Sequence, residues 1–83
     1  MKQYVIYIQT NDTNNEIKNG YVKGTTWHYA TIVDIVSDFK KAIMFPSVTA
    51  AEAYAVNLQT KFPDTYYYEI FELDEQNNLK SVS

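Results

Sequence analysis

The sequence predicts a small α+β domain, in which a mainly antiparallel sheet carries one helix on one of its faces. Apolar and aromatic residues alternate with period two near both ends of the chain, which favours strands. An Ala-rich stretch with helical spacing precedes the last of these strands. The 83 residues suffice for a single domain, 1–83. The expected order is β-β-β-α-β, with a short trailing strand left open.

The first strand is predicted over residues 3–10. Tyr4, Ile6 and Ile8 lie on one face of this strand, and Tyr7 lies on the other. β-branched and aromatic residues in strict alternation are typical of a strand that is at least half buried.

The next elements are separated by polar and turn-forming residues. Residues 11–20 are rich in Asn and Asp and end in a glycine, so we expect a loop there. Residues 21–36 are good strand formers, and we expect one or two strands with a break near Gly24 and Thr25. After a turn, residues 41–45 are predicted to form a further strand that Pro46 ends.

A helix is predicted over residues 50–61. Thr49 and Glu52 have the spacing of a capping box, in which Thr49 caps the first turn and Glu52 reaches back. Pro63 is expected to stop the helix. The apolar positions at helical spacing are Ala51, Tyr54, Ala55, Leu58 and Phe62.

The last long strand is predicted over residues 66–73, followed by a turn and a short edge strand near residues 79–82. Its two faces carry, respectively, Tyr66, Tyr68, Ile70 and Glu72, and Tyr67, Glu69, Phe71 and Leu73. One helix covers only one face of a sheet, so the second face is expected to expose aromatic side chains. Such an exposed patch usually marks an interaction site.

Composition excludes several classes of function. The chain has no cysteine, which rules out disulfides and thiolate chemistry and favours a reducing compartment. Its seven lysines, absence of arginine and net charge of −3 argue against duplex nucleic-acid binding. The N-terminal apolar run is too short for a membrane span or a signal-peptide core. We therefore expect a cytoplasmic protein without a membrane partner.

The sequence shows no catalytic machinery, and we predict a non-enzymatic protein without a cofactor. His28 is the only histidine, and no Gly-x-Ser-x-Gly motif accompanies it. The two glycines form no phosphate-binding loop, and one histidine without cysteine gives no ordinary zinc site. Glu69 and Glu72 are expected on opposite faces of a strand, so they cannot act as a glycosidase pair.

Residues 38–73 resemble small proteins encoded by phages and prophages of low-GC Gram-positive bacteria. The resemblance is carried by the stretch from Asp38-Phe39-Lys40-Lys41 to Glu52-Ala53 and by Tyr68-Glu69-Ile70-Phe71. It implies core positions at Ala42, Phe45, Ala53 and Leu58 and assigns no functional residue. It also implies a biological context, since small acidic phage proteins often bind and block a host protein. A defence nuclease such as a CRISPR effector would be such a target.

The leading hypothesis is therefore a protein-interaction module that binds a protein partner or a second copy of itself, and the resemblance makes it a candidate phage-encoded inhibitor. The candidate partner-binding residues are Trp27, Tyr29, Asp34, Asp38, Tyr66, Tyr67, Tyr68, Glu69 and Glu72. One alternative is a binder of single-stranded nucleic acid, with sheet aromatics for stacking and Lys40 and Lys41 for charge. The other is a small homodimeric structural or accessory protein.

Overall fold

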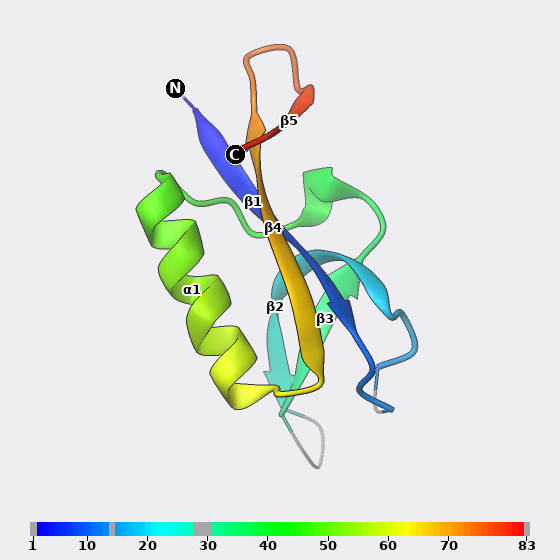
Figure 1. Ribbon diagram of the computed structural model, residues 1–83. Helices are drawn as coiled ribbons and strands as arrows, with labels where there is room; N and C mark the ends of the chain where they lie inside the picture. The colour runs from blue at the N-terminus through cyan, green and yellow to red at the C-terminus, as the bar shows by residue number, and fades with distance from the viewer. Residues whose placement is uncertain (1, 14, 28–30, 83) are drawn as a thin grey trace.

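A five-stranded antiparallel sheet forms the frame of the protein (Figure 1). The computed structural model describes residues 2–13, 15–27 and 31–82, and the description excludes the side chains of residues 26, 27 and 31. The elements are β1 (Gln3–Thr10), β2 (Asn19–Trp27), β3 (Thr31–Val36), the 3-10 turn η1 (Phe39–Lys41), α1 (Val48–Lys61), β4 (Thr65–Leu73) and β5 (Leu79–Ser81). The strand order is β3-β2-β1-β4-β5, and α1 packs on one face. The predicted α+β class is confirmed, and the order β-β-β-α-β with a trailing strand holds, with β3 in place of the strand predicted over residues 41–45.

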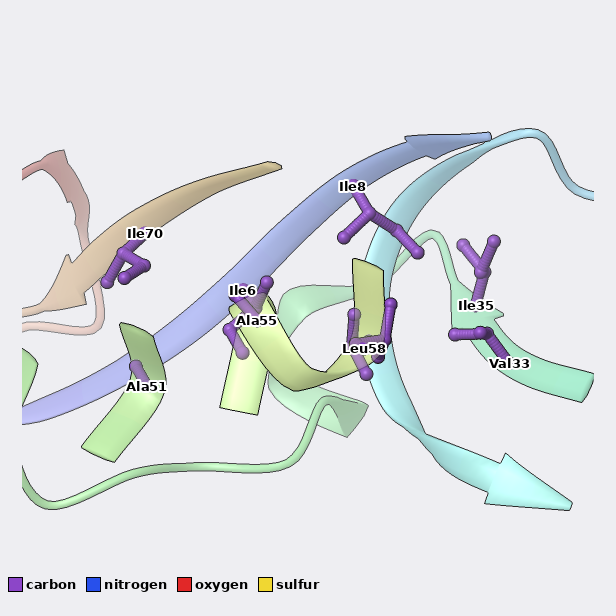
Figure 2. Close-up of a cluster of buried hydrophobic side chains, with 9 residues drawn as sticks. Ile6, Ile8, Val33, Ile35, Ala51, Ala55, Leu58 and Ile70 are labelled. Atoms are coloured by element: carbon purple, nitrogen blue, oxygen red, sulfur yellow. The ribbon is translucent and has the colours of Figure 1, made fainter. Parts of the chain in front are cut away.

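The core lies between the sheet and α1. It consists of Ile6, Ile8, Val22, Val33, Ile35, Ala51, Ala55, Leu58 and Ile70, most of which Figure 2 labels. The predicted helical stripe is confirmed, because Ala51 and Ala55 are fully buried and Leu58 is nearly so. Two alanines on this stripe let the helix backbone approach the central strand β1 closely, and Leu58 fills the space further along the helix.

The N-terminus of α1 differs from the prediction. Ser47 is the N-cap, and its Oγ accepts a hydrogen bond of 3.1 Å from the Ala50 amide. Thr49 already lies inside the helix, so the predicted capping box is wrong. Glu52 instead accepts a hydrogen bond from the Tyr68 hydroxyl, at 3.2 Å, which ties the helix to β4. Serine is the better N-cap of the two, and Ser47 has the extended backbone angles of a cap, φ −151° and ψ 160°.

The strand predicted over residues 41–45 is also wrong. Asp38 Oδ1 accepts the Lys40 amide at 3.0 Å, and this local bond favours the turn η1 in place of an extended chain. Beyond η1 the chain makes two contacts with the sheet. The Ile43 amide bonds to the Val22 carbonyl at 3.0 Å, and Phe45 forms an isolated antiparallel bridge with Tyr4.

The sheet contains two irregularities, of which the sequence indicated only the first, as a possible break between strands. The break expected near Gly24 is a bulge inside a continuous β2, where the pairing with β3 shifts between Val22 and Gly24. Gly24 has a φ of +154°, a backbone angle that disfavours side chains. The second shift lies between Gln9 and Thr10, where β1 pairs with β4 and Tyr66 has no partner in the register.

The core positions implied by the phage resemblance are mostly buried. Ala42 and Leu58 are buried, and Phe45 packs against the core. Ala53 is exposed on α1, so that implied position is wrong. Its place between the stripe positions Ala51 and Ala55 turns it away from the sheet.

Candidate functional site

The face of the sheet opposite α1 carries a continuous group of aromatic rings. This aromatic face consists of Tyr7, Tyr21, Phe39, Tyr67 and Phe71. Tyr7, Tyr21, Tyr67 and Phe71 occupy positions on the three inner strands that alternate with core residues. The turn η1 supplies Phe39, and in Figure 1 this turn and α1 lie on opposite sides of the sheet.

The rings contact each other edge to face. The ring centroids of Tyr7 and Tyr21 are 5.6 Å apart with an interplanar angle of 67°, and Tyr7 and Phe71 are 6.4 Å apart at 88°. Tyr67 also lies 6.4 Å from Tyr7, at 72°. Edge-to-face pairs fix the ring orientations, which makes the surface a pre-formed one. Burial and the neighbouring Tyr7 raise the pKa of Tyr21 above its ordinary value.

The aromatic face is open at one end and closed at the other. Val5, Ala42 and Leu73 are buried without belonging to the core against α1, so part of this side of the sheet is covered. Tyr67, in contrast, keeps 41% of its surface exposed. The exposed part of the aromatic face is therefore centred on the first half of β4.

Glu69 lies in the middle of this exposed part. It is the register partner of Tyr7 on β1, and it lies between Tyr67 and Phe71 along one face of β4. Its Oε1 accepts a hydrogen bond from the Tyr67 hydroxyl and its Oε2 accepts one from Ser81 Oγ, each at 2.6 Å. These two bonds lower the pKa of Glu69, and the bond from Ser81 has the larger effect. The hydrogen bond between Tyr67 and Glu69 also raises the pKa of Tyr67.

The structure brings only part of the predicted binding set together on this face. Tyr67 and Glu69 lie on it, as expected. Tyr68 packs against the core on the helix side, and burial and its bond to Glu52 raise its pKa. Glu72 lies on the same side as Tyr68 along β4, where it forms an ion pair of 3.5 Å with Lys2. Tyr66 is 59% exposed, at the bulge of β4, and makes none of the ring contacts that define the aromatic face.

The remaining predicted residues lie around the edge of the sheet or outside the described part. Asp34 alternates with the buried Val33 and Ile35 on β3, which turns it toward the side of the aromatic face. Asp38 caps η1 next to Phe39. The backbone of Trp27 pairs with Thr31, but its side chain, like the whole of Tyr29, lies outside the described residues.

Four members of the aromatic face were missing from the predicted binding set: Tyr7, Tyr21, Phe39 and Phe71. The alternation of β1 and β4 did separate Tyr7 and Phe71 from the face that carries Ile6 and Ile70, without showing which face the helix covers. Tyr7 and Phe71 come close to Tyr21 and Phe39 only through the strand order and the position of η1. No local sequence pattern predicts either of these.

The described residues contain no cluster of metal ligands. No group of three or more His, Asp or Glu side chains among residues 2–13, 15–27 and 31–82 is arranged to hold a metal ion. A hollow beside α1, lined by Tyr54, Asn57, Lys61 and neighbouring residues, has a volume of about 130 Å³. Two open surface hollows, one beside Glu72 and one beside Asp34, have volumes of about 300 and 290 Å³. His28 lies outside the described part of the chain.

Comparisons with known proteins leave the aromatic face as the main guide to function. The chain matches no protein-family model, no curated protein and no solved structure. Within the described residues, no helix combines the length and the apolar character that crossing a membrane requires.

Proposed function

We propose that this protein is a non-enzymatic protein-interaction module whose partner docks on the aromatic face. The observation that carries the proposal is the chain of edge-to-face rings from Phe39 to Tyr67 on the side of the sheet that α1 does not cover. Tyrosine and phenylalanine are enriched in protein interfaces, because they bring large rigid areas at a low cost in conformational entropy.

The resemblance of residues 38–73 to small phage and prophage proteins adds a hypothesis about the partner. It suggests a host protein whose activity is blocked when this chain binds, for example a defence nuclease. A block by steric contact fits the mild net charge of −3 better than mimicry of a nucleic acid does. The action then takes place in the cytoplasm of the host cell.

The position of Glu69 weighs against the alternative of single-stranded nucleic-acid binding. A carboxylate between Tyr67 and Phe71 repels the phosphates of a strand that stacks on these rings. We expect no quenching of tyrosine fluorescence when an oligonucleotide is added at low salt. Salt-sensitive quenching that Tyr67→Ala abolishes would favour the nucleic-acid alternative instead.

The proposal is tested by comparing two exposed tyrosines on the same strand. Tyr67→Ala removes a ring from the aromatic face, whereas Tyr66→Ala removes a more exposed ring that makes no contact with the face. Each variant and the wild type are immobilised and used to capture proteins from lysates of low-GC Gram-positive hosts. We expect a stoichiometric partner whose recovery falls at least about tenfold for Tyr67→Ala only.

Circular dichroism of both variants checks that the fold is kept. Equal recovery by the wild type and Tyr67→Ala would contradict the proposal. Light scattering covers the remaining alternative, since a dimer that Tyr67→Ala converts to monomer would assign the aromatic face to a second copy of the chain.

A further inference from the structure

We infer that the aromatic face binds an arginine side chain of the partner at Tyr7, Tyr67, Glu69 and Phe71, which we call the arginine site. The inference rests on the proposed function and names the chemistry of the docking group. Its basis is the juxtaposition of three ring systems and one carboxylate on a single face of β1 and β4.

The arginine site is built by strand register. Tyr7 and Glu69 are directly paired across β1 and β4, and Tyr67 and Phe71 lie two residues before and after Glu69 on the same face. The centroids of Tyr67 and Phe71 each lie 6.4 Å from that of Tyr7. The carboxylate is thus held among rings, and its position is fixed by the bond from the Tyr67 hydroxyl.

The carboxylate has room for two further donors. A carboxylate offers about four acceptor positions on its two oxygens. Tyr67 fills one on Oε1 and Ser81 fills one on Oε2, which leaves one on each oxygen. A guanidinium donates two parallel N–H bonds to the two oxygens of one carboxylate, so its geometry matches the open positions.

The charge of the site is not compensated within the described part of the chain. The one ion pair recorded among residues 2–13, 15–27 and 31–82 joins Lys2 to Glu72, on the other face of β4. The hydrogen bonds to Glu69 lower its pKa, which keeps the carboxylate ionised at neutral pH. A partner cation would therefore meet a full negative charge next to aromatic rings, a combination that favours cations.

A guanidinium group suits this site better than an ammonium group does, and a second copy of the chain cannot supply it. It is planar and weakly hydrated, so it stacks on ring faces while its edge reaches the carboxylate. The sequence contains no arginine, so the group comes from a different protein. Tyr67 is 41% exposed, so part of its surface is accessible before any rearrangement.

The test uses N-acetylarginine amide as the probe and NMR shifts of the folded full chain as the readout. We expect saturable shifts at the ring protons of Tyr7, Tyr67 and Phe71. N-acetylcitrulline amide has nearly the same shape without the charge and should bind at least about tenfold more weakly. Equal shifts with the citrulline compound would overturn the inference, and so would equal binding of N-acetyllysine amide.

Two carboxylate variants on opposite faces of β4 locate the site. Glu69→Gln should weaken the arginine probe at least about tenfold, whereas Glu72→Gln, on the side of Lys2, should leave it unchanged. A larger loss of affinity for Glu72→Gln than for Glu69→Gln would place the cation elsewhere and contradict the inference. NMR shifts confined to the turn after β4 would do the same.

The failure of this inference is distinguishable from that of the proposed function. Partner capture that depends on Tyr67 but survives Glu69→Gln would keep the docking face and remove the arginine. Capture that is independent of both residues would remove the proposed function itself.

Discussion

The two faces of the sheet use different apolar side chains. Against α1 the fully enclosed residues are aliphatic, with Ile6 and Ile8 at 0% exposure, and partly buried rings such as Tyr68 pack around them. On the aromatic face the rings stay partly open, and Tyr67 and Glu69 share a hydrogen bond there. Enclosed aliphatic groups contribute most to the free energy of folding, and amphipathic rings tolerate both water and a partner. The helix side thus holds the fold together, which leaves the aromatic face available for binding.

The largest expected effect is the difference in stability loss between truncating a side chain on the helix side and truncating one on the aromatic face. Ile6→Ala removes a fully enclosed side chain and should lower the free energy of unfolding by about 2–5 kcal/mol. Tyr67→Ala, on the exposed part of the other face, should cost about 1 kcal/mol or less. Urea unfolding followed by circular dichroism measures both. Similar losses for the two variants would contradict the division of roles between the faces.

Close packing on the helix side is tested at Gly20, which pairs with Ile8. A Cβ at this position would lie 2.7 Å from Ile35 Cγ2 and 2.7 Å from the Val36 carbonyl oxygen. Gly20→Ala should therefore lower the free energy of unfolding by about 1–3 kcal/mol. A neutral effect in urea unfolding would show that the sheet can open locally, and the contrast between the faces would weaken.

The helix that closes this side depends on a serine cap. Ser47→Ala removes the acceptor of the Ala50 amide and should cost about 1 kcal/mol in urea unfolding. Thr49→Ala is the matched control, because Thr49 lies inside α1 and should change stability by no more than about 0.5 kcal/mol. A larger loss for Thr49→Ala would restore the capping box expected from the sequence.

The smallest effect concerns the charge on the aromatic face. The pKa of Glu69 lies below its ordinary value of 4.5, owing first to Ser81 and then to Tyr67. A lowered carboxyl pKa in the folded state stabilises the fold above the unfolded pKa, and this contribution is lost as pH falls through the folded pKa. The urea midpoint of the wild type should thus fall toward that of Glu69→Gln on acidification.

Urea midpoints measured over a pH series from about 7 downward follow this titration. Glu75→Gln, an exposed position beyond β4, serves as the control. Carboxyl NMR titration adds a direct readout, in which Ser81→Ala and Tyr67→Phe should each raise the pKa of Glu69. An unchanged pKa in both variants would mean that these hydroxyls do not hold the carboxylate.

Much of the fold could be predicted because the periodicity of apolar residues along the sequence determines its main strands and its helix. Alternation in β1 and β4 gave both strands and their two faces, and the stripe from Ala51 to Leu58 gave the helix and its buried side. The sequence indicated a break near Gly24 without showing that it is a bulge within one strand, and it missed the turn η1. The bulge shifts the alternation of β2 by one residue, and η1 depends on a single side-chain bond.

The candidate site was predicted only in part for the same reason. Tyr67 and Glu69 were found because they share one face of a strong strand. Tyr21 and Phe39 join that face only once β2 lies beside β1 and η1 folds toward Tyr21. Tyr68 and Glu72 were assigned to the binding set although they lie on the helix side, since aromatic and acidic residues run through both faces of β4.

The central position of β1 has a consequence for the protein as it is made on the ribosome. β1 is synthesised first, yet it pairs with β4, whose first residue is Thr65. The helix that encloses Ile6 and Ile8 also follows β1 by about half the chain. The nascent N-terminal half thus carries an apolar strand without its cover until the last third has emerged. We expect β1 to fold only once β4 has emerged, with chaperones shielding that strand in the meantime.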